Sequence, residues 1–214
     1  MKIREINLFF PEVVFTKILN EIDDTELEKL NKEVSILKYV KSGLSKDIQN
    51  NNTSFSSDNR YIFSLPEFNN LKNIILNEFN KFKNNTLKYN SNNFVYTTSW
   101  ATKSLPNQKS DYHNHANCFY SGIFYLNTDK DCGDLVFNNF NIKGFNIIPT
   151  EYNDYNSKSY KIKPKNKLLT FFPSHLAHRI ALNTSNITRY SIAFNFIPVN
   201  KIGEGDSELI LNIW

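Results

Sequence analysis

Two segments in the first half of the chain have the periodicity of amphipathic helices. In residues 23–43 apolar positions recur every three to four residues, an Asp-Asp-Thr start offers N-caps, and Gly43 marks a stop. Residues 65–85 repeat the pattern next to Pro66, a residue favoured in the first helical turn. The sequence therefore predicts two helices, with these apolar faces: Leu27, Leu30, Val34 and Leu37 in the first, and Phe68, Leu71, Ile75, Phe79 and Phe82 in the second.

Two further segments flank the first helix. Residues 2–10 alternate between polar and apolar side chains, which predicts an edge strand. Residues 45–59 are rich in Asn and Ser and predict a mobile loop between the two helices.

From residue 94 onward the pattern changes to short apolar or alternating runs separated by Asn, Gly, Asp and Pro. Such runs are typical of strands, and no helical segment lies between them. This arrangement favours a sandwich or jelly roll over a parallel sheet. The candidate strands are residues 94–101, 119–126, 133–137, 145–149, 159–163, 167–172, 176–182 and 189–197.

The chain has 214 residues, of which 40% are hydrophobic, enough for the core of one domain. We expect a single domain over residues 1–214, mainly β with N-terminal helices. Its parts are a helical support region over about 22–90, a β core over about 94–198 and a C-terminal extension over 199–214.

Charge and cysteine content narrow the class of protein. The net charge is +4 and the lysines are dispersed, so a nucleic-acid surface is not indicated. The N-terminus has no apolar leader followed by a cleavage site, and no apolar run is long enough to span a membrane. Cys118 and Cys132 need no partner in a reducing compartment. These features predict a soluble cytoplasmic protein.

The four histidines fall in two clusters, His113 with His115 and His175 with His178. Residues two apart on a strand point to the same face, so His113 and His115 can present their imidazoles together. Neutral imidazole binds iron, zinc, copper or nickel. His178 lies in an otherwise apolar strand, where an unpaired imidazole is costly to bury. The sequence favours these three as metal ligands, and His175, three residues from His178, as a non-ligand.

Arg189 begins the apolar segment 189–197. A guanidinium in a core strand requires an anion, and its planar fork suits a carboxylate, either of a ligand or of an acidic residue of this chain. Ser191 and Tyr125 are candidate hydroxyl donors to the same anion or ordinary sheet residues. Trp100 and Phe124 are interpreted as core aromatics, and Asn195 as a hydrogen-bonded buried residue. No glycine-rich phosphate loop or nucleophile motif is present.

The segments SWATK, HNHANCFYSGIFYLN, GDLVF, KLLTFFPSHLAHRI and RYSIAFNF, in this order, resemble the double-stranded β-helix of the iron(II) and 2-oxoglutarate-dependent oxygenases. The resemblance covers about Asn59 to Pro198. It is greatest to the oxygenases of phage and marine bacterial genomes that are related to prolyl 4-hydroxylases. It implies Fe(II), 2-oxoglutarate and O2 as reactants, and a hydroxylated product together with succinate and carbon dioxide.

The resemblance also implies roles for individual residues. His113 and His178 match the two histidine ligands of the iron. Arg189 matches the arginine that pairs with the far carboxylate of 2-oxoglutarate, with Ser191 beside it and Tyr125 as a further donor. Most members have Asp or Glu where this chain has His115. We therefore expect a three-histidine site, with Asp111 or a water as the alternative third ligand. A neutral ligand leaves the iron one charge more positive, which is expected to raise its reduction potential.

The substrate implied by the relation to prolyl hydroxylases is a peptidyl side chain, with residues 45–59 and 149–158 as candidate lids. Two alternatives stay open from the residues themselves. One is a cupin-type enzyme that uses three histidines without 2-oxoglutarate. The other is a non-catalytic jelly-roll binding protein in which the histidines are incidental.

Overall fold

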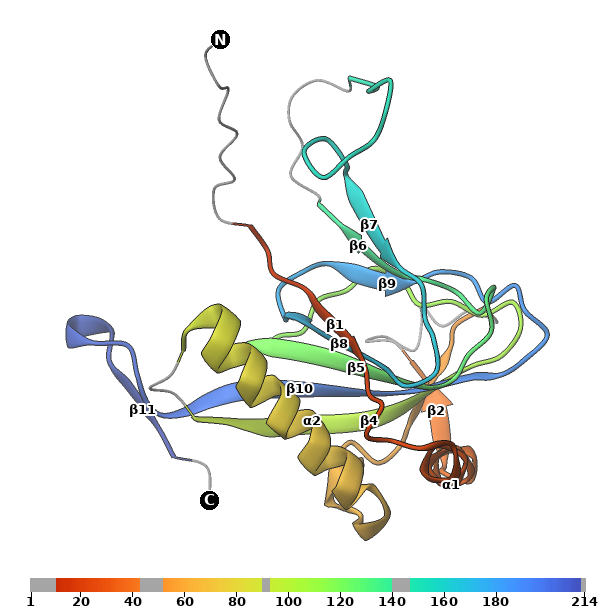
Figure 1. Cartoon of the computed structure of the whole chain (residues 1–214), viewed down its shortest axis with the longest axis horizontal. Coiled ribbons are helices and arrows are strands. Elements are labelled where there is room, and N and C mark those ends of the chain that lie inside the picture. Colours follow the sequence, from red (N-terminus) through yellow and green to blue (C-terminus); the bar gives the residue numbers. More distant parts are fainter. Residues whose placement is uncertain (1–10, 43–51, 90–92, 140–146, 213–214) are drawn as a thin grey trace.

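The computed structural model describes residues 11–42, 52–89, 93–139 and 147–212. In this part of the chain a large antiparallel sheet carries two helices on one face and a smaller antiparallel sheet on the other (Figure 1). This is the mainly β, jelly-roll architecture that the sequence predicted. The predicted strand at residues 2–10 lies outside the described residues.

The large sheet has eight strands. Seven follow one another in the order β1-β8-β5-β10-β4-β3-β2, and β11 pairs with β10 beyond this path. Every pairing is antiparallel, and the longest strands, β10 and β4, lie side by side in the middle of the sheet (Figure 1). The bounds are β1 Phe15–Ile18, β2 Tyr39–Lys41, β3 Phe55–Ser57, β4 Asn93–Ser104, β5 Tyr120–Asn127, β8 Leu168–Pro173, β10 Arg189–Ile202 and β11 Leu209–Leu211.

The smaller sheet has three strands in the order β7-β6-β9, namely β7 Ser159–Ile162, β6 Leu135–Asn138 and β9 His178–Ile180. Strand β9 is shorter than the predicted segment 176–182. Of the predicted strand at 145–149, residues 147–149 form no strand, and the remainder lies outside the described residues. Ile147 and Ile148 are exposed, because no neighbouring strand covers this part of the β6–β7 connection.

Helix α1 spans Asp24–Ser35 and helix α2 spans Asn69–Phe82. The side chain of Asp23 caps α1 by accepting a hydrogen bond from the backbone N–H of Glu26 at 2.8 Å. Helix α2 follows two 3-10 turns and continues into one π turn, and a last 3-10 turn precedes β11. These turns are Ile62–Ser64, Pro66–Phe68, Lys83–Leu87 and Gly205–Ser207.

The first helix is shorter than predicted, because the chain joins the sheet instead of continuing to Gly43, which lies outside the described residues. Residues 39–41 form β2, which pairs with β3. The hydroxyl of Tyr39 donates to the carbonyl of Val34 at 2.7 Å and so satisfies one acceptor at the helix end. The predicted loop 45–59 is likewise wrong at Phe55–Ser57, where backbone pairing with β2 and β4 outweighs the polar composition.

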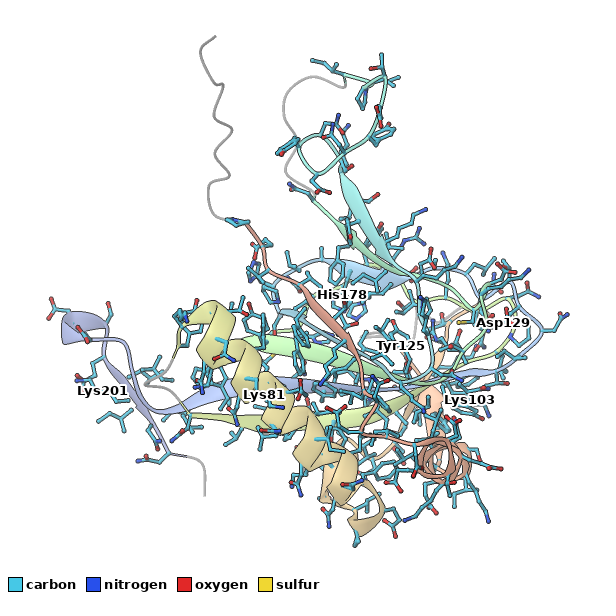
Figure 2. All side chains as sticks on the ribbon, viewed as in Figure 1. Lys81, Lys103, Tyr125, Asp129, His178 and Lys201 are labelled. Carbon is cyan, nitrogen blue, oxygen red and sulfur yellow. The ribbon has the colours of Figure 1, made fainter. Side chains whose placement is uncertain are left out.

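The two faces of β5 enter two different cores. Phe124 and Leu126 pack with the apolar faces of α1 and α2, whereas Ile123 and Tyr125 pack between the sheets. A strand covered on both faces reads as a continuous apolar run, as this segment does. The functional side chains identified below lie on the inter-sheet face, and Figure 2 shows Tyr125 and His178 among the strands, with Lys81 on α2.

Gly122 on β5 has no room for a side chain. A Cβ at this position would lie 2.3 Å from Cε2 of Phe194 and 2.8 Å from the carbonyl oxygen of Thr170. Because one of these neighbours is backbone, Gly122→Ala is expected to destabilise the fold by about 1–3 kcal/mol through overpacking. Urea denaturation followed by circular dichroism measures this loss, and an unchanged midpoint would contradict the packing described here.

Candidate metal and cosubstrate site

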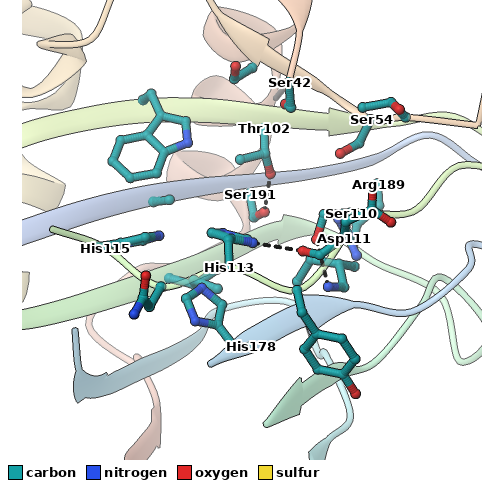
Figure 3. Close-up of a pocket in the computed structure, with 18 of the residues that line it drawn as sticks. Ser42, Ser54, Thr102, Ser110, Asp111, His113, His115, His178, Arg189 and Ser191 are labelled. Atoms are coloured by element: carbon teal, nitrogen blue, oxygen red, sulfur yellow. Dashed lines mark hydrogen bonds between the residues drawn. The ribbon is translucent and has the colours of Figure 1, made fainter. Parts of the chain in front are cut away.

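Three histidines converge between the two sheets. One nitrogen from each of His113, His115 and His178 lies within 4.8 Å of the others, and the rings face one another (Figure 3). The backbones of His113 and His178 exchange two hydrogen bonds of 2.9 Å. This bridge joins the segment before β5 to the start of β9, so the two sequence clusters become one site.

The side chains of His113 and His178 are oriented by backbone carbonyls. Nδ1 of His113 lies 2.8 Å from the carbonyl oxygen of Asp111, and Nδ1 of His178 lies 2.8 Å from that of Leu176. A carbonyl oxygen can only accept a hydrogen bond, so each Nδ1 carries the proton and donates it. Nε2 of both rings is left with its lone pair, which is the form that binds a metal.

His115 is oriented by side chains instead. Its Nδ1 lies 2.7 Å from Oδ1 of Asn195 and 2.8 Å from Oγ of Ser121. Sequence reasoning did not assign Asn195 and Ser121 to the site, although the two-residue spacing of Asn195 from Ala193 and Ser191 places all three on one face of β10.

Burial keeps two of the imidazoles neutral. It lowers the pKa of His115 to about 4 and that of His178 to about 3. His178 is only 2% exposed. At neutral pH both rings can therefore bind a cation without first losing a proton.

The other candidate ligands lie elsewhere. The carboxylate of Asp111 is outside the three-histidine cluster and lies 3.6 Å from Nζ of Lys109. His175 is largely exposed, and its Nε2 lies 2.8 Å from Oε1 of Glu12. The structure thus brings His113, His115 and His178 together. Asp111 lines the same cavity with its carboxylate outside the cluster, and His175 lies apart from the cavity.

A cavity of about 500 Å³ extends from the histidines to Arg189. Arg189 is 1% exposed, and its Nη1 donates to the carbonyl oxygens of Cys132 and Gly133 at 3.2 and 3.3 Å. Among the described residues, no hydrogen-bond partner meets its Nε and no carboxylate forms an ion pair with it. Burial lowers the pKa of this guanidinium. A buried cation of this kind requires an anionic partner.

Two hydroxyl groups lie near Arg189. The phenol of Tyr125 is fully buried, and within the described part of the chain its oxygen has no hydrogen-bond partner. Burial raises the pKa of Tyr125, so the phenol keeps its proton and can donate it. Ser191 lines the cavity and shares a 2.6 Å hydrogen bond with Thr102 of β4, as Figure 3 shows.

The N-terminal part of the chain forms a second wall of the cavity. The sequence predicted a contribution from this part only as a candidate lid at residues 45–59. Trp100 also lines the cavity and packs against the inter-sheet core only in part, so its role is not confined to the core. Phe124, in contrast, is a fully buried core residue. The residues of the second wall are Ser42, Thr53, Ser54, Ser56 and Arg60.

The side chains fit a divalent metal and an anionic cosubstrate. Three neutral nitrogen donors within 4.8 Å of one another match the preference of iron and other first-row transition metals for imidazole. Arg189 lines the cavity and its Nε has no hydrogen-bond partner among the described residues, so its guanidinium suits a carboxylate. Tyr125 lies beneath the cavity wall and does not line the cavity. The histidines and the guanidinium border one cavity, so a molecule that binds the metal at one end can reach Arg189 at the other.

The comparisons with known proteins agree with this geometry. Residues 98–195 match the family model described as "Putative 2OG-Fe(II) oxygenase". No curated protein matches the chain in sequence.

Several solved structures share the fold at low sequence identity. A prolyl hydroxylase from Trichoplax adhaerens, in complex with a hypoxia inducible factor peptide fragment, is 15% identical, with a TM-score of 0.60 over 87% of this chain and 83% of that one. A Pseudomonas putida prolyl-4-hydroxylase is 13% identical, with a TM-score of 0.54 over 85% and 91%. HygX from Streptomyces hygroscopicus, with nickel, 2-oxoglutarate and hygromycin B bound, is 11% identical, with a TM-score of 0.56 over 87% and 82%.

These structures establish the fold, which is that of the double-stranded β-helix oxygenases. The family model spans the β4–β5 connection, which carries His113 and His115, and the strands that carry His178 and Arg189. The cavity contains donors for both a divalent metal and a carboxylate. Over residues 98–195 the chain therefore matches the 2OG-Fe(II) oxygenase family, and its enzyme class is that of an oxidoreductase that uses Fe(II), 2-oxoglutarate and O2.

Proposed function

We propose that this oxygenase hydroxylates a peptidyl side chain of the prolyl type, with His113, His115 and His178 as the iron ligands. Arg189, Ser191 and Tyr125 would bind the far carboxylate of 2-oxoglutarate. The observation that carries the proposal is the buried Arg189 without an acidic partner among the described residues, in the same cavity as three converging imidazoles.

Each residue has a defined part in binding and orientation. Nε2 of each histidine would hold the metal, because Nδ1 of each donates to an oxygen. The planar guanidinium of Arg189 suits two parallel hydrogen bonds to a carboxylate, and Tyr125 adds a third donor. When bound, iron with 2-oxoglutarate supplies the oxidising power for substrate hydroxylation, with succinate and carbon dioxide as the co-products.

A peptide substrate is supported by the cavity wall and by the structural neighbours. The second wall is formed by Ser42, Thr53, Ser54, Ser56 and Arg60, and Ser54 and Ser56 are buried. We propose that the part of the predicted lid 45–59 that borders the cavity, residues 53–56, contacts the substrate. Residues 149–158 do not line the cavity, so a lid role for them has less support. Two of the similar folds are prolyl hydroxylases, and one of those structures contains a peptide.

Of the two alternatives, a cupin-type enzyme without 2-oxoglutarate leaves the buried charge of Arg189 unexplained, and the family match opposes a purely binding role. The three neutral ligands are what the cupin alternative expects, so the test must detect 2-oxoglutarate at the metal.

The test is the visible absorption of the anaerobic protein during addition of Fe(II) and then 2-oxoglutarate. We expect a charge-transfer band that requires both additions, since it arises from a cosubstrate bound directly to iron. Bound iron without a band on adding 2-oxoglutarate would favour the cupin alternative. Proline-containing peptides are then incubated with the complete system, and a mass gain of one oxygen atom identifies a substrate.

We propose a cytoplasmic location. Cys118 and Cys132 are both free thiols, which suits a reducing compartment. In the described ranges no helix has the length and apolar character needed to cross a bilayer.

A further inference from the structure

We propose that Asn195 is a positioning residue that holds His115 in the tautomer protonated at Nδ1, so that Nε2 presents its lone pair to the metal. The inference rests on the proposed metal site and deepens it. His115 occupies the position where most members of the family have a carboxylate. A carboxylate binds a metal through either oxygen, whereas an imidazole binds only if the correct nitrogen is unprotonated.

The amide of Asn195 is fixed from both sides. Its Nδ2 donates to Oγ1 of Thr98 on the neighbouring strand β4 at 3.0 Å. This contact turns the carbonyl oxygen towards the site, where Oδ1 lies 2.7 Å from Nδ1 of His115. Asn195 is 8% exposed, so little water is available to replace these contacts. In this orientation the acceptor of the amide faces both His115 and the hydroxyl of Ser121.

Only Asn195 can impose the tautomer. An amide oxygen has no hydrogen, so a ring nitrogen that faces it must be the donor. The second neighbour, Ser121, has its Oγ 2.8 Å from the same Nδ1. A hydroxyl can accept from Nδ1–H or donate to an unprotonated Nδ1, so Ser121 is compatible with both tautomers. Its oxygen also lies 2.7 Å from Oδ1 of Asn195 and 2.8 Å from Oγ of Ser174, which offer its proton other acceptors.

His115 differs in this respect from the other two ligands. His113 and His178 are oriented by main-chain carbonyls, which belong to the strand framework. His115 is the ligand in the cluster whose orientation depends on a side chain, and the opposite tautomer would direct an N–H at the metal. Partners that orient metal-bound histidines typically contribute about 10- to 100-fold to metal affinity.

The first readout needs no metal. The protein has four histidines, so long-range proton–nitrogen NMR of ¹⁵N-histidine-labelled protein resolves each ring, with assignment by single His→Gln variants. In the wild type we expect His115 as the Nδ1–H tautomer. Asn195→Leu, which is close in volume and has no acceptor, should give a mixture containing the Nε2–H form. Ser121→Ala is the matched control and should leave the Nδ1–H tautomer in place.

The second readout is Co(II) affinity, measured by the visible spectrum of the bound ion. We expect Asn195→Leu to weaken Co(II) binding by about 10- to 100-fold. Ser121→Ala should weaken it by only a few-fold. Asn195→Asp keeps an acceptor at the same position and should retain the Nδ1–H tautomer. If Asn195→Leu does not fold, the tautomer of His115 in Asn195→Asp still tests the proposal.

The outcomes separate the two proposals. Wild-type protein that binds no Co(II) overturns the metal site itself. Wild-type protein that binds Co(II), with unchanged tautomer and affinity in Asn195→Leu, overturns the role of Asn195 and leaves the metal site intact. An Nε2–H tautomer of His115 in the wild type or in Asn195→Asp overturns the role as well.

Discussion

Replacement of His178 by Ala is expected to weaken Fe(II) binding by more than about 100-fold, a larger effect than loss of an outer partner of a ligand. His178 is the most buried of the three imidazoles, and its backbone pairs with that of His113. Without the imidazole of His178, two histidines of the cluster are left to bind the metal, His113 and His115, and they lie two residues apart. Competition with a coloured chelator under nitrogen measures the affinity.

His175→Ala is the matched control for this experiment. His175 lies three residues earlier and contacts Glu12 at the surface, so its removal should leave the affinity for Fe(II) unchanged. Thermal unfolding of both metal-free variants reports whether the fold is retained. A folded His178→Ala protein that binds Fe(II) as tightly as the wild type would refute the proposed ligand set.

Replacement of Arg189 by Met is expected to weaken 2-oxoglutarate binding by about 30-fold or more, which corresponds to the 2–5 kcal/mol typical of removing one partner of a buried charge pair. The side chain of Met fills much of the same space but cannot donate to the carboxylate. Because the three histidines are unaltered, Fe(II) affinity should change little. Calorimetric titration of 2-oxoglutarate into the anaerobic Fe(II) protein gives both the affinity and the stoichiometry.

Arg179→Met provides the matched control, because Arg179 packs over the ring of Tyr112 and does not line the cavity. This variant should bind 2-oxoglutarate as the wild type does. Equal affinities in the Arg189 and Arg179 variants would remove the basis for assigning the cosubstrate to this end of the cavity.

Much of the β core and the main site residues followed from the sequence, because their signals are local. Strands β5 and β8 are mainly apolar runs, since both faces of the large sheet are covered there. Strands β4 and β10 contain the short apolar or alternating segments that are typical of strands. The two-residue spacing of His113 and His115 predicted that their imidazoles lie together, as they do, although the β4–β5 connection that carries them is not a strand. His178 and Arg189 stand out as polar residues in apolar segments. Such polar residues in a core need partners, which made them candidates, and the family resemblance then assigned their roles.

Features that depend on distant pairing were not predictable. Strands β2 and β3 are short and partly polar, and they exist because each supplies hydrogen bonds to a neighbour far along the chain. For the same reason the first helix ends at Ser35 and the serines at 54 and 56 form a cavity wall. Local propensity cannot reveal an interaction whose partner is set by the fold.

Asn195 shows most clearly which features are predictable from the local sequence and which depend on the fold. Its place in the apolar segment 189–197 predicts that this amide is buried and hydrogen-bonded. Its partners are His115, Ser121 and Thr98, which come from three separate segments and meet only when the sheet is folded. A polar residue in an apolar segment can be predicted to have a hydrogen-bond partner, because buried polar groups are almost always paired. The identity of the partner depends on how the strands pack, which the local sequence does not show.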